Sequence, residues 1–234
     1  ETKIKEENIF IAPLGVNSSI FKPAEMNENG PTIFFNCGKW ELRKGHDILL
    51  KAFSKAFTSQ DDVELWMMCE NPFLTTEESD SWRTYYKDSD IGDKIKILPR
   101  VDSCQEVYNN MKPVHCGVFP SRAEGWNLEV LELMSCGKHI ITTDYSAHTQ
   151  FCNKENSMLI SIDSTEKAYD GKFFREGDGE WAELKENQLD QLVDYLKLVH
   201  QKRKTGELAV NSSGIETANK FSWDNCAKEM LKSC

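Results

Sequence analysis

Short apolar runs rich in β-forming residues alternate with segments of helical pattern along most of this 234-residue chain. This alternation constrains the fold more than any other feature of the sequence, because parallel β-α-β units produce it. The apolar runs span residues 31–37, 63–69, 94–98, 115–119, 139–143 and 157–162. Helical patterns include residues 46–57, 104–111, 147–152 and 187–200. The sequence therefore predicts an α/β fold, a doubly wound parallel sheet of about six strands with helices on both faces, whose ligand site lies at the carboxyl ends of the strands.

The segment from Phe119 to Gly137 follows the fourth apolar run and predicts a helix that begins after Gly125 and ends at Gly137. Glu124 lies just before that helix and Glu132 two turns inside it, with seven residues between them. Free backbone N–H groups and the helix dipole hold phosphate readily at such a helix start. The second carboxylate lies among apolar residues and needs hydrogen-bond donors, which ribose hydroxyls would supply. The segment thus indicates a nucleotide-linked ligand across a helix N-terminus, while an amphipathic helix with two solvated glutamates is the alternative.

The same segment resembles the Glu-x7-Glu motif of retaining glycosyltransferases with the GT-B architecture, which has two Rossmann-like domains. The resemblance is to the large family that contains sucrose-phosphate synthases and bacterial mannosyltransferases, the glycosyl transferases group 1. It implies that this chain is one Rossmann-like half of a GT-B fold, that Glu124 contacts the transferred sugar, and that Glu132 holds the ribose. The other substrate-binding residues expected in this segment are Ser121, Gly125, Trp126, Asn127 and Leu128, of which the last three would hold the diphosphate through their amides.

A second motif lies after the first apolar run, where Gly38-Lys-Trp-Glu-Leu-Arg-Lys-Gly45 leads into a helical pattern. It resembles the family's strand, Gly-Arg-Leu, short loop and Lys-Gly, in which the Arg and the Lys neutralise the departing diphosphate. By register, the resemblance gives these roles to Lys39 and Lys44, with Gly38 beside the ligand. Lys39, Lys44 and Glu124 are therefore the predicted catalytic residues. Cations placed where negative charge develops stabilise a leaving group without a metal. Surface charge is the alternative role for both lysines.

Several positions depart from the family's pattern. Lys39 replaces an arginine, and a lysine offers a point charge where an arginine offers a planar fork for phosphate. Arg43 is a candidate substitute, although its loop position predicts a solvated side chain. Asn127 replaces a glycine that lets the backbone approach the phosphate, and asparagine tolerates unusual backbone angles. Ser146-Ala-His148 replaces a glycine-containing turn, so the donor pocket is expected to differ from the family's usual one.

The remaining resemblance concerns the end of the third apolar run and both ends of the chain. Arg100 and Val101 follow that run, where the family contacts the base through its main chain; a plain strand-to-helix loop is the alternative. Residues 11–17 resemble the family's interdomain connection. This predicts a linker and last strand of an N-terminal domain at 1–24, and a nucleotide-sugar (donor) binding domain with C-terminal helices at 25–234. The acceptor-binding N-terminal domain would act in cis or in trans, and this part would be inactive alone.

Composition limits the partners of the chain. Its net charge of −10, from 28 basic and 38 acidic residues, argues against nucleic acid or an anionic membrane as a partner of this part. No apolar stretch approaches the ~18 residues of a membrane-spanning helix. Eight cysteines without a Cys-x-x-Cys spacing indicate reduced thiols in a cytoplasmic protein. Any membrane-peripheral attachment would depend on the N-terminal domain.

Two further segments are expected to take no part in the chemistry. Asp88-Ser-Asp90 matches the Asp-x-Asp pattern of metal-dependent glycosyltransferases, but it follows a helical pattern and not an apolar strand, which indicates a solvated helix end. Residues 163–180 contain three glycines and mixed charge, which predicts a long loop, with a lid as the alternative.

These features together predict transfer of a sugar from a UDP-, GDP- or ADP-linked donor to an acceptor hydroxyl, with retention of configuration and with no metal or other cofactor. Two other functions remain open: a non-catalytic nucleotide-sugar-binding module, and a nucleotide-sugar epimerase of the same architecture.

Overall fold

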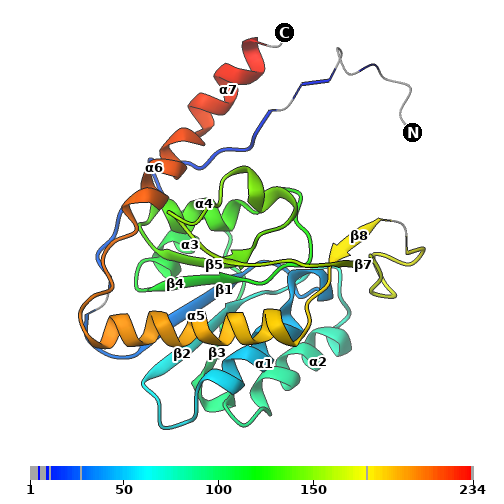
Figure 1. Cartoon of the computed structure of the whole chain (residues 1–234), viewed down its shortest axis with the longest axis vertical. Helices are drawn as coiled ribbons and strands as arrows, with labels where there is room; N and C mark the ends of the chain where they lie inside the picture. Colours follow the sequence, from blue (N-terminus) through cyan, green and yellow to red (C-terminus); the bar gives the residue numbers. More distant parts are fainter. Residues whose placement is uncertain (1–4, 6–8, 11, 27, 178, 233–234) are drawn as a thin grey trace.

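The computed structural model describes residues 5, 9–10, 12–26, 28–177 and 179–232. Its centre is a sheet of six parallel strands in the order β3-β2-β1-β4-β5-β6 (Figure 1). The strands are β1 (Thr32–Cys37), β2 (Val63–Met68), β3 (Ile95–Ile97), β4 (Cys116–Phe119), β5 (His139–Thr143) and β6 (Met158–Ile160). The chain starts at the centre, winds to one edge and then returns to build the other half. This order confirms the predicted doubly wound parallel sheet.

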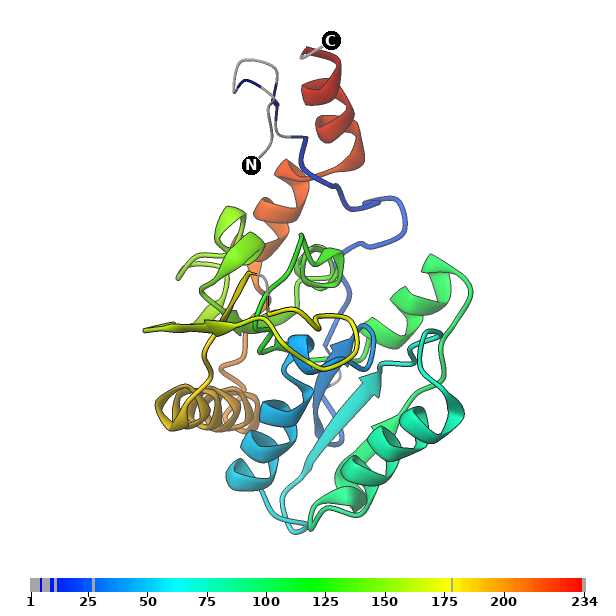
Figure 2. The same cartoon turned by 90° about the vertical axis from the view of Figure 1, so that its right-hand side faces the viewer.

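Helices cover both faces of the sheet, as Figure 2 shows from the side. One face is covered by α1 (His46–Ala56), α2 (Thr76–Lys87) and α5 (Glu186–Lys204). The other face is covered by α3 (Cys104–Met111), α4 (Leu128–Ser135) and α6 (Ser212–Lys220). The last helix, α7 (Trp223–Lys232), extends away from the sheet (Figure 1). Short 3-10 helices are η2 (Leu42–Lys44), η3 (Gly92–Lys94) and η4 (Ser146–Gln150).

The central strand β1 shows why the sheet is buried on both sides. Its side chains alternate between the two faces, and Phe34 enters the core under α1 and α5. Ile33 and Phe35 enter the second core under α3 and α4. All three side chains are almost completely buried. A strand that is apolar at consecutive positions can lie only where both faces are covered, and a doubly wound sheet provides that place.

The helical pattern predicted at residues 147–152 corresponds to a short 3-10 helix and not to an α-helix. The segment forms the 3-10 helix η4 and closes at Phe151, whose N–H donates to the carbonyl of His148 (3.1 Å). Ser146, its first residue, has a left-handed backbone with φ 52°, which an α-helix does not accommodate. This tight turn brings the side chain of His148 back under the sheet edge, where it is fully buried.

The predicted loop at residues 163–180 includes regular structure. Its first part forms β7 (Thr165–Lys167), which pairs in antiparallel fashion with β8 (Glu180–Ala182) in a separate two-stranded sheet. Trp181 of β8 is buried and packs edge-on against Phe174, with 5.0 Å between ring centroids. The hairpin therefore has a small apolar contact of its own, which the charged and glycine-rich sequence did not indicate.

The segment before β1 packs along the C-terminal helices. The N–H of Val16 donates to the carbonyl of Phe221 (2.8 Å), and Val16 pairs with Ser222 in a single parallel bridge. Figures 1 and 2 show this segment beside α6 and α7 at one end of the molecule. Residues 1–4, 6–8 and 11 of the predicted linker lie outside the described residues, and the boundary at residue 24 stays a prediction.

The cysteines that the structure describes are free thiols at positions 37, 69, 104, 116, 136, 152 and 226; Cys234 lies outside the described residues. Among the described helices, none is both long and apolar enough to cross a membrane.

Candidate functional site

The carboxyl ends of β1 and β4 meet at the centre of the sheet, and the loops that follow them form the candidate site. The two strands are neighbours, with Phe34 opposite Cys116 and Phe35 opposite Gly117. After β1 the chain turns towards α1 on one face, and after β4 it turns towards α4 on the other. Loops that leave a sheet in opposite directions mark the topological switch point, which is where doubly wound sheets bind ligands.

Glu124 is the centre of the contacts in this candidate site. Its Oε1 lies 2.8 Å from Nζ of Lys44 and accepts a hydrogen bond from the hydroxyl of Ser121 (3.0 Å). Its Oε2 lies 2.8 Å from Nη1 of Arg43. The side chains of Glu124 and Lys44 are only 6% and 7% exposed. The structure thus brings together three residues that the two motifs predicted, Lys44, Ser121 and Glu124, and adds Arg43.

These contacts continue as a chain of alternating charge. Arg43 donates through Nε (3.1 Å) and Nη2 (2.7 Å) to Oε2 of Glu41, a buried carboxylate. The other oxygen of Glu41 lies 3.3 Å from Nζ of Lys39. The order Lys39, Glu41, Arg43, Glu124, Lys44 therefore alternates positive and negative groups from the surface inward. We call these five residues the charge chain.

The charge chain keeps its buried members ionised. Burial alone would raise the pKa of Glu124, but Lys44 and Arg43 outweigh it, so this pKa lies below its usual value. Burial would likewise lower the pKa of Lys44, yet Glu129 and Glu124 together raise it. The pKa of Arg43 is raised for the same reason, by Glu124 and Glu41 against the effect of burial. Each ion is therefore stabilised in its charged form by the neighbours it contacts.

Two glycines allow this arrangement. Gly45 has a left-handed backbone with φ 73°, and a Cβ there would lie 1.9 Å from the carbonyl oxygen of Pro120. Only glycine therefore permits η2 to turn into α1 this close to the β4 loop. A Cβ on Gly38, the predicted ligand neighbour, would lie 3.3 Å from Cε of Lys44. The Lys44 side chain thus passes directly over the Gly38 backbone to reach Glu124.

The start of α4 presents backbone amides that have no cap. Asn127 occupies the N-cap position with φ 77°, and its side chain makes no capping hydrogen bond. Among the described residues, the N–H groups of Trp126, Asn127 and Leu128 have no hydrogen-bond acceptor. Gly125, beside them, is exposed, and a Cβ at this position would enter open space. The predicted diphosphate-binding amides thus have no hydrogen-bond acceptor among the described residues, which leaves donors for an anion at this helix start.

His148, which the sequence placed only in a divergent turn, holds the side chain of Asn127. Its Nε2 lies 2.9 Å from Nδ2 of Asn127, and its Nδ1 lies 2.8 Å from Oγ1 of Thr142. Burial lowers the pKa of His148 to about 4, so the ring is neutral near pH 7. A neutral ring that accepts from Asn127 carries its proton on Nδ1 and donates it to Thr142. This network fixes the left-handed residue at the start of α4.

Glu132 lies on the second turn of α4, where another carboxyl group, Glu129, acts on it. Burial, reinforced by Glu129, raises its pKa to about 8, so the carboxyl is mainly neutral at pH 7. Among the described residues, its carboxyl group has no hydrogen-bond partner. Glu129 was missed by the sequence interpretation, although its spacing of three residues from Glu132 places both on one helix face. The pKa of the nearby Cys37 thiol is also raised, mainly by burial and further by Glu129 and Glu132.

Three predicted site residues, Lys39, Arg100 and Val101, make no hydrogen bond or ion pair with Glu124 in the described part of the chain. Lys39 is 43% exposed and points to Glu41 and to the ring of Phe73, whose centroid lies 5.1 Å from its Nζ. The exposed Arg100 donates its backbone N–H to the carboxylate of Glu70 (3.2 Å). Val101 packs against the core under α3 and α4. The roles predicted for these three residues stay predictions.

The expectation that Arg43 is solvated is wrong. Its side chain is 16% exposed, and its guanidinium contacts Glu41, Glu124 and the carbonyl oxygen of Ala123 (2.7 Å). The N–H of Arg122 fixes the same loop by donating to the Arg43 carbonyl (2.7 Å). Two buried carboxylates on the β1 and β4 loops provide the partners that draw this arginine inward.

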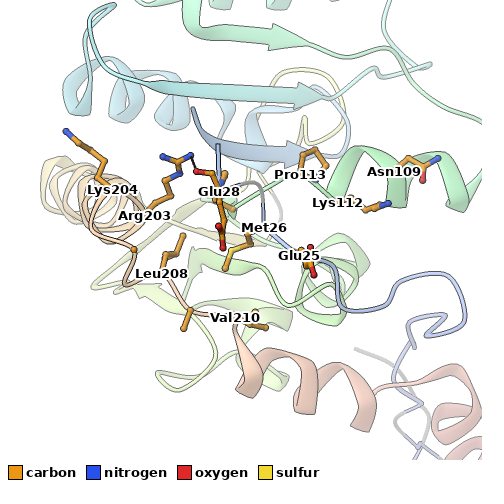
Figure 3. Close-up of a pocket in the computed structure, with 13 residues that line it drawn as sticks. Glu25, Met26, Glu28, Asn109, Lys112, Pro113, Arg203, Lys204, Leu208 and Val210 are labelled. Carbon is orange, nitrogen blue, oxygen red and sulfur yellow. Dashed lines mark hydrogen bonds between the residues drawn. The ribbon is translucent and has the colours of Figure 1, made fainter. Parts of the chain in front are cut away.

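Two other parts of the molecule lie apart from this site. Asp88 and Asp90 are exposed at the end of α2, as predicted, and no group of three metal-binding side chains occurs within the described ranges. A hollow lies at the opposite edge, beside the amino ends of β1 and β4 (Figure 3). There Arg203 donates to the carbonyls of Glu28 (2.8 Å) and Gly30 (2.5 Å), so its guanidinium already serves a backbone turn. This hollow contains none of the predicted site residues.

Known proteins resemble this chain in sequence profile and in fold. The profile of the family described as Glycosyl transferases group 1 matches residues 30–171. A search of curated protein sequences gave no significant match. The fold is similar to that of a sucrose-phosphate synthase from Thermosynechococcus elongatus, with a TM-score of 0.71 and 16% identity over 94% of this chain and 50% of that one. This chain therefore spans about half the length of that enzyme.

Two further solved structures are similar in fold. The C-terminal domain of a glycosyl transferase group 1 family protein from Francisella tularensis has a TM-score of 0.67 and 16% identity, over 89% of this chain and 100% of that one. HepE from Anabaena, solved in complex with UDP-glucose, has a TM-score of 0.68 and 12% identity, over 94% of this chain and 55% of that one. The fold is thus that of the C-terminal half of a GT-B protein, and the chain belongs to the glycosyl transferases group 1 family.

Proposed function

We propose that this domain binds the nucleotide-diphospho-sugar donor of a retaining, metal-independent glycosyltransferase. The observation that carries the proposal is the meeting of two largely buried cations, Arg43 and Lys44, on Glu124 directly before the uncapped start of α4. Cations and free helix amides both attract phosphate, and they lie at the strand ends where doubly wound sheets bind nucleotides.

The donor is proposed to lie along the start of α4. Its diphosphate accepts hydrogen bonds from the amides between Trp126 and Leu128 and from the cation Lys44. Its ribose hydroxyls meet Glu132, whose carboxyl group lies two turns further along the helix with no partner among the described residues. The base extends towards the main chain of Arg100 and Val101, after β3. The sugar lies on the side of Glu124.

The proposed reaction breaks the bond between the anomeric carbon and the diphosphate oxygen, and the electron pair moves to the diphosphate. The acceptor hydroxyl oxygen forms the new bond on the same face of the sugar, and its proton passes to a diphosphate oxygen. Charge that develops on the diphosphate is stabilised by the cations and by the positive end of α4. Glu124 and Glu132 flank the donor, unlike the carboxylate pair of a glycosidase, which acts on one glycosidic bond.

Several observations support this assignment. Membership of the glycosyl transferases group 1 family supports a role in sugar transfer. HepE was solved in complex with UDP-glucose, so UDP-sugars are the first donors to test. The acceptor is proposed to bind to an N-terminal domain, since the chain spans only half of the sucrose-phosphate synthase it resembles.

A thermal-shift panel tests donor binding directly. The chain would be heated with UDP, GDP, ADP, CMP and the corresponding nucleotide-sugars, each with and without EDTA. We expect one nucleoside diphosphate to raise the melting temperature, because a ligand that binds only the folded state stabilises it. The increase should be unchanged by EDTA. A rise that EDTA abolishes would contradict metal independence, and no rise with any of these ligands would contradict donor binding.

A second assay separates transfer from the alternatives. The domain would be combined with its N-terminal partner, the donor chosen by the panel and a mixture of sugar acceptors, and the products followed by mass spectrometry. We expect a glycosylated acceptor and free nucleoside diphosphate. Conversion of the donor to an isomer without any acceptor would indicate an epimerase, and binding without turnover would indicate a non-catalytic module.

A further inference from the structure

The charge chain contains three cations, and only two of them lie where a single anion could meet both. Lys44 and Arg43 contact the two oxygens of the same carboxylate, each at 2.8 Å. Any anionic group that replaces the Glu124 carboxylate between them is therefore within reach of both. The structure holds this position with an internal carboxylate, which shows that the two cations together accept a planar, two-oxygen anion.

Lys39 is arranged differently. Its Nζ is bound to Glu41 at 3.3 Å and lies over the exposed ring of Phe73. Glu41 lies between Lys39 and Arg43, so its negative charge separates Lys39 from the anion position at Glu124. At 43% exposure, the charge of Lys39 is also screened by solvent. An anion beside Lys44 would thus gain little from Lys39.

Arg43 is by contrast prepared to bind. An arginine has five N–H donors in a fixed plane. Four hydrogen bonds use them: Nε and Nη2 donate to Glu41, and Nη1 donates to the Ala123 carbonyl and to Glu124. One Nη2 donor therefore remains, and the Nη1 donor on Glu124 becomes available when that carboxylate moves away. The bonds to Glu41 and Ala123 keep the guanidinium oriented during this exchange.

Glu41 itself is held by the core. Its backbone N–H donates to Nδ1 of His46 (3.3 Å), and burial lowers the pKa of His46 to about 3, so the ring stays neutral and able to accept. Nε2 of His46 pairs with Oδ1 of Asn36 (3.1 Å), whose amide nitrogen donates to the Val118 carbonyl (2.7 Å). This network connects the β1 and β4 strand ends, and it fixes the carboxylate that orients Arg43.

We infer that Arg43, and not Lys39, is the second cation that binds the donor diphosphate together with Lys44. This inference rests on the proposed function and names one residue of the same site. The guanidinium supplies the planar, two-donor contact that a lysine at position 39 does not provide. Glu124 occupies the position between the two cations while the site is empty, and it gives up Arg43 when the diphosphate enters.

The test compares variants of equal charge change by titration calorimetry with UDP, GDP and ADP. We expect Arg43→Ala to weaken binding of the preferred diphosphate by roughly 10- to 100-fold, the loss typical of a hydrogen bond between charged groups. Lys44→Ala should cause a similar loss, and Lys39→Ala a loss below about 3-fold. Arg43→Lys should recover part of the affinity. Lys96→Ala, an exposed lysine on β3, is the matched control for a lost positive charge.

A second measurement distinguishes a binding role of Arg43 from a purely structural one. The matching nucleoside, without phosphate, is titrated by NMR against the same variants, and its affinity should be equal in the wild type and Arg43→Ala. Equal losses for nucleoside and diphosphate would show that Arg43 only supports the fold and would overturn the inference. So would a large loss in Lys39→Ala with none in Arg43→Ala, while the proposed function would stand because Lys44→Ala still weakens binding. If the wild type binds no diphosphate, the proposed function itself fails.

Discussion

The loop before α4 and the second turn of α4 carry the two carboxylates of one motif, and their surroundings differ completely. At the loop, Glu124 contacts Arg43 and Lys44, and these cations lower its pKa against the effect of burial. Two turns further, Glu132 meets another carboxylate, Glu129, and its pKa rises to about 8. Burial raises the pKa of both groups, so the difference comes from the neighbouring charges.

The comparison suggests how one helix can serve two parts of a donor. In the proposed site, the charged Glu124 belongs to the group of ions that binds phosphate, and the ligand would exchange partners with this carboxylate. The mainly neutral Glu132 has no hydrogen-bond partner among the described residues, so a hydroxyl-bearing ligand would fill an open hydrogen-bonding position. Four predictions test this difference, beginning with the largest expected effect.

Removing Glu124 should cost the fold most. Glu124→Ala leaves Arg43 and Lys44 close together without the anion between them, and breaking a buried ion pair in this way costs about 3–5 kcal/mol. Urea unfolding at pH 7 measures this loss. Glu124→Gln should cost less, because the amide oxygen still accepts a hydrogen bond. The matched control is Glu186→Ala, which removes an exposed partner of Lys55 and should leave the unfolding midpoint nearly unchanged. Equal midpoints for Glu124→Ala and this control would contradict the charge chain.

Replacing Glu132 should change the pH dependence of stability. The folded pKa of about 8 lies above the usual 4.5, so both states are protonated well below pH 4.5, where the contribution of Glu132 to stability is highest. As the pH rises through 8, the unfolded state ionises first and this contribution is lost, on the order of 5 kcal/mol in total. Glu132→Gln should remove this decline. Unfolding free energies measured at half-unit steps between pH 5 and pH 9 would show it. A wild type and a variant with parallel profiles would contradict the neutral state of Glu132.

Features of the fold and of the site were predictable from the sequence where they depend on the local pattern of residues, and were not where they depend on contacts between distant elements. The six strands were predictable because buried parallel strands are apolar at consecutive positions, as Phe34 and Phe35 are. The meeting of Lys44 with Glu124 was predictable because both follow strands whose carboxyl ends share one edge. The inward turn of Arg43 was not, since it depends on buried carboxylates from two distant loops. A sequence pattern gives spacing along one element but not contacts between elements.

The same limit applies to the rest of the site. Glu129 acts on Lys44 of η2 and on Cys37 at the end of β1, which belong to other elements, so its effect on their pKa values could not be deduced from spacing. His148 reaches Asn127 only because η4 is a tight 3-10 turn that begins at a left-handed Ser146. Backbone angles of this kind are favoured by glycine and are rarely indicated by serine.

The two carboxylates should affect diphosphate affinity in opposite directions. Glu124→Gln removes a negative charge that competes with the phosphate for Arg43 and Lys44, and should tighten binding by roughly 3- to 10-fold. Glu132→Gln removes an acceptor for the ribose and should weaken binding by roughly 10-fold. Calorimetry with the diphosphate chosen by the thermal-shift panel measures both. The 2′,3′-dideoxy analogue is the control, because Glu132→Gln should not weaken it. Losses in both variants, of similar size, would contradict the assignment of separate roles.

A separate effect on stability is expected from the residues that support the start of α4. His148→Ala removes the acceptor of Asn127 and the donor to Thr142, at a cost of about 1–3 kcal/mol for unsatisfied buried groups. Asn127→Gly in the same background should recover part of the stability, because glycine adopts the left-handed backbone without needing its side chain held. Thermal unfolding of the single and double variants gives the coupling between the two residues. Fully additive losses would contradict a shared network.

The titration of the two carboxyl groups themselves tests the central comparison most directly. Carbon-13 NMR of the glutamate side-chain carboxyls, with Glu124→Gln and Glu132→Gln to assign the two signals, follows each group between about pH 3 and pH 10. The account predicts that Glu124 titrates below its usual pKa and that Glu132 titrates near 8. Titration of both groups together near 4.5 would show that the cations do not hold Glu124 and that Glu132 is solvated, and would contradict the account.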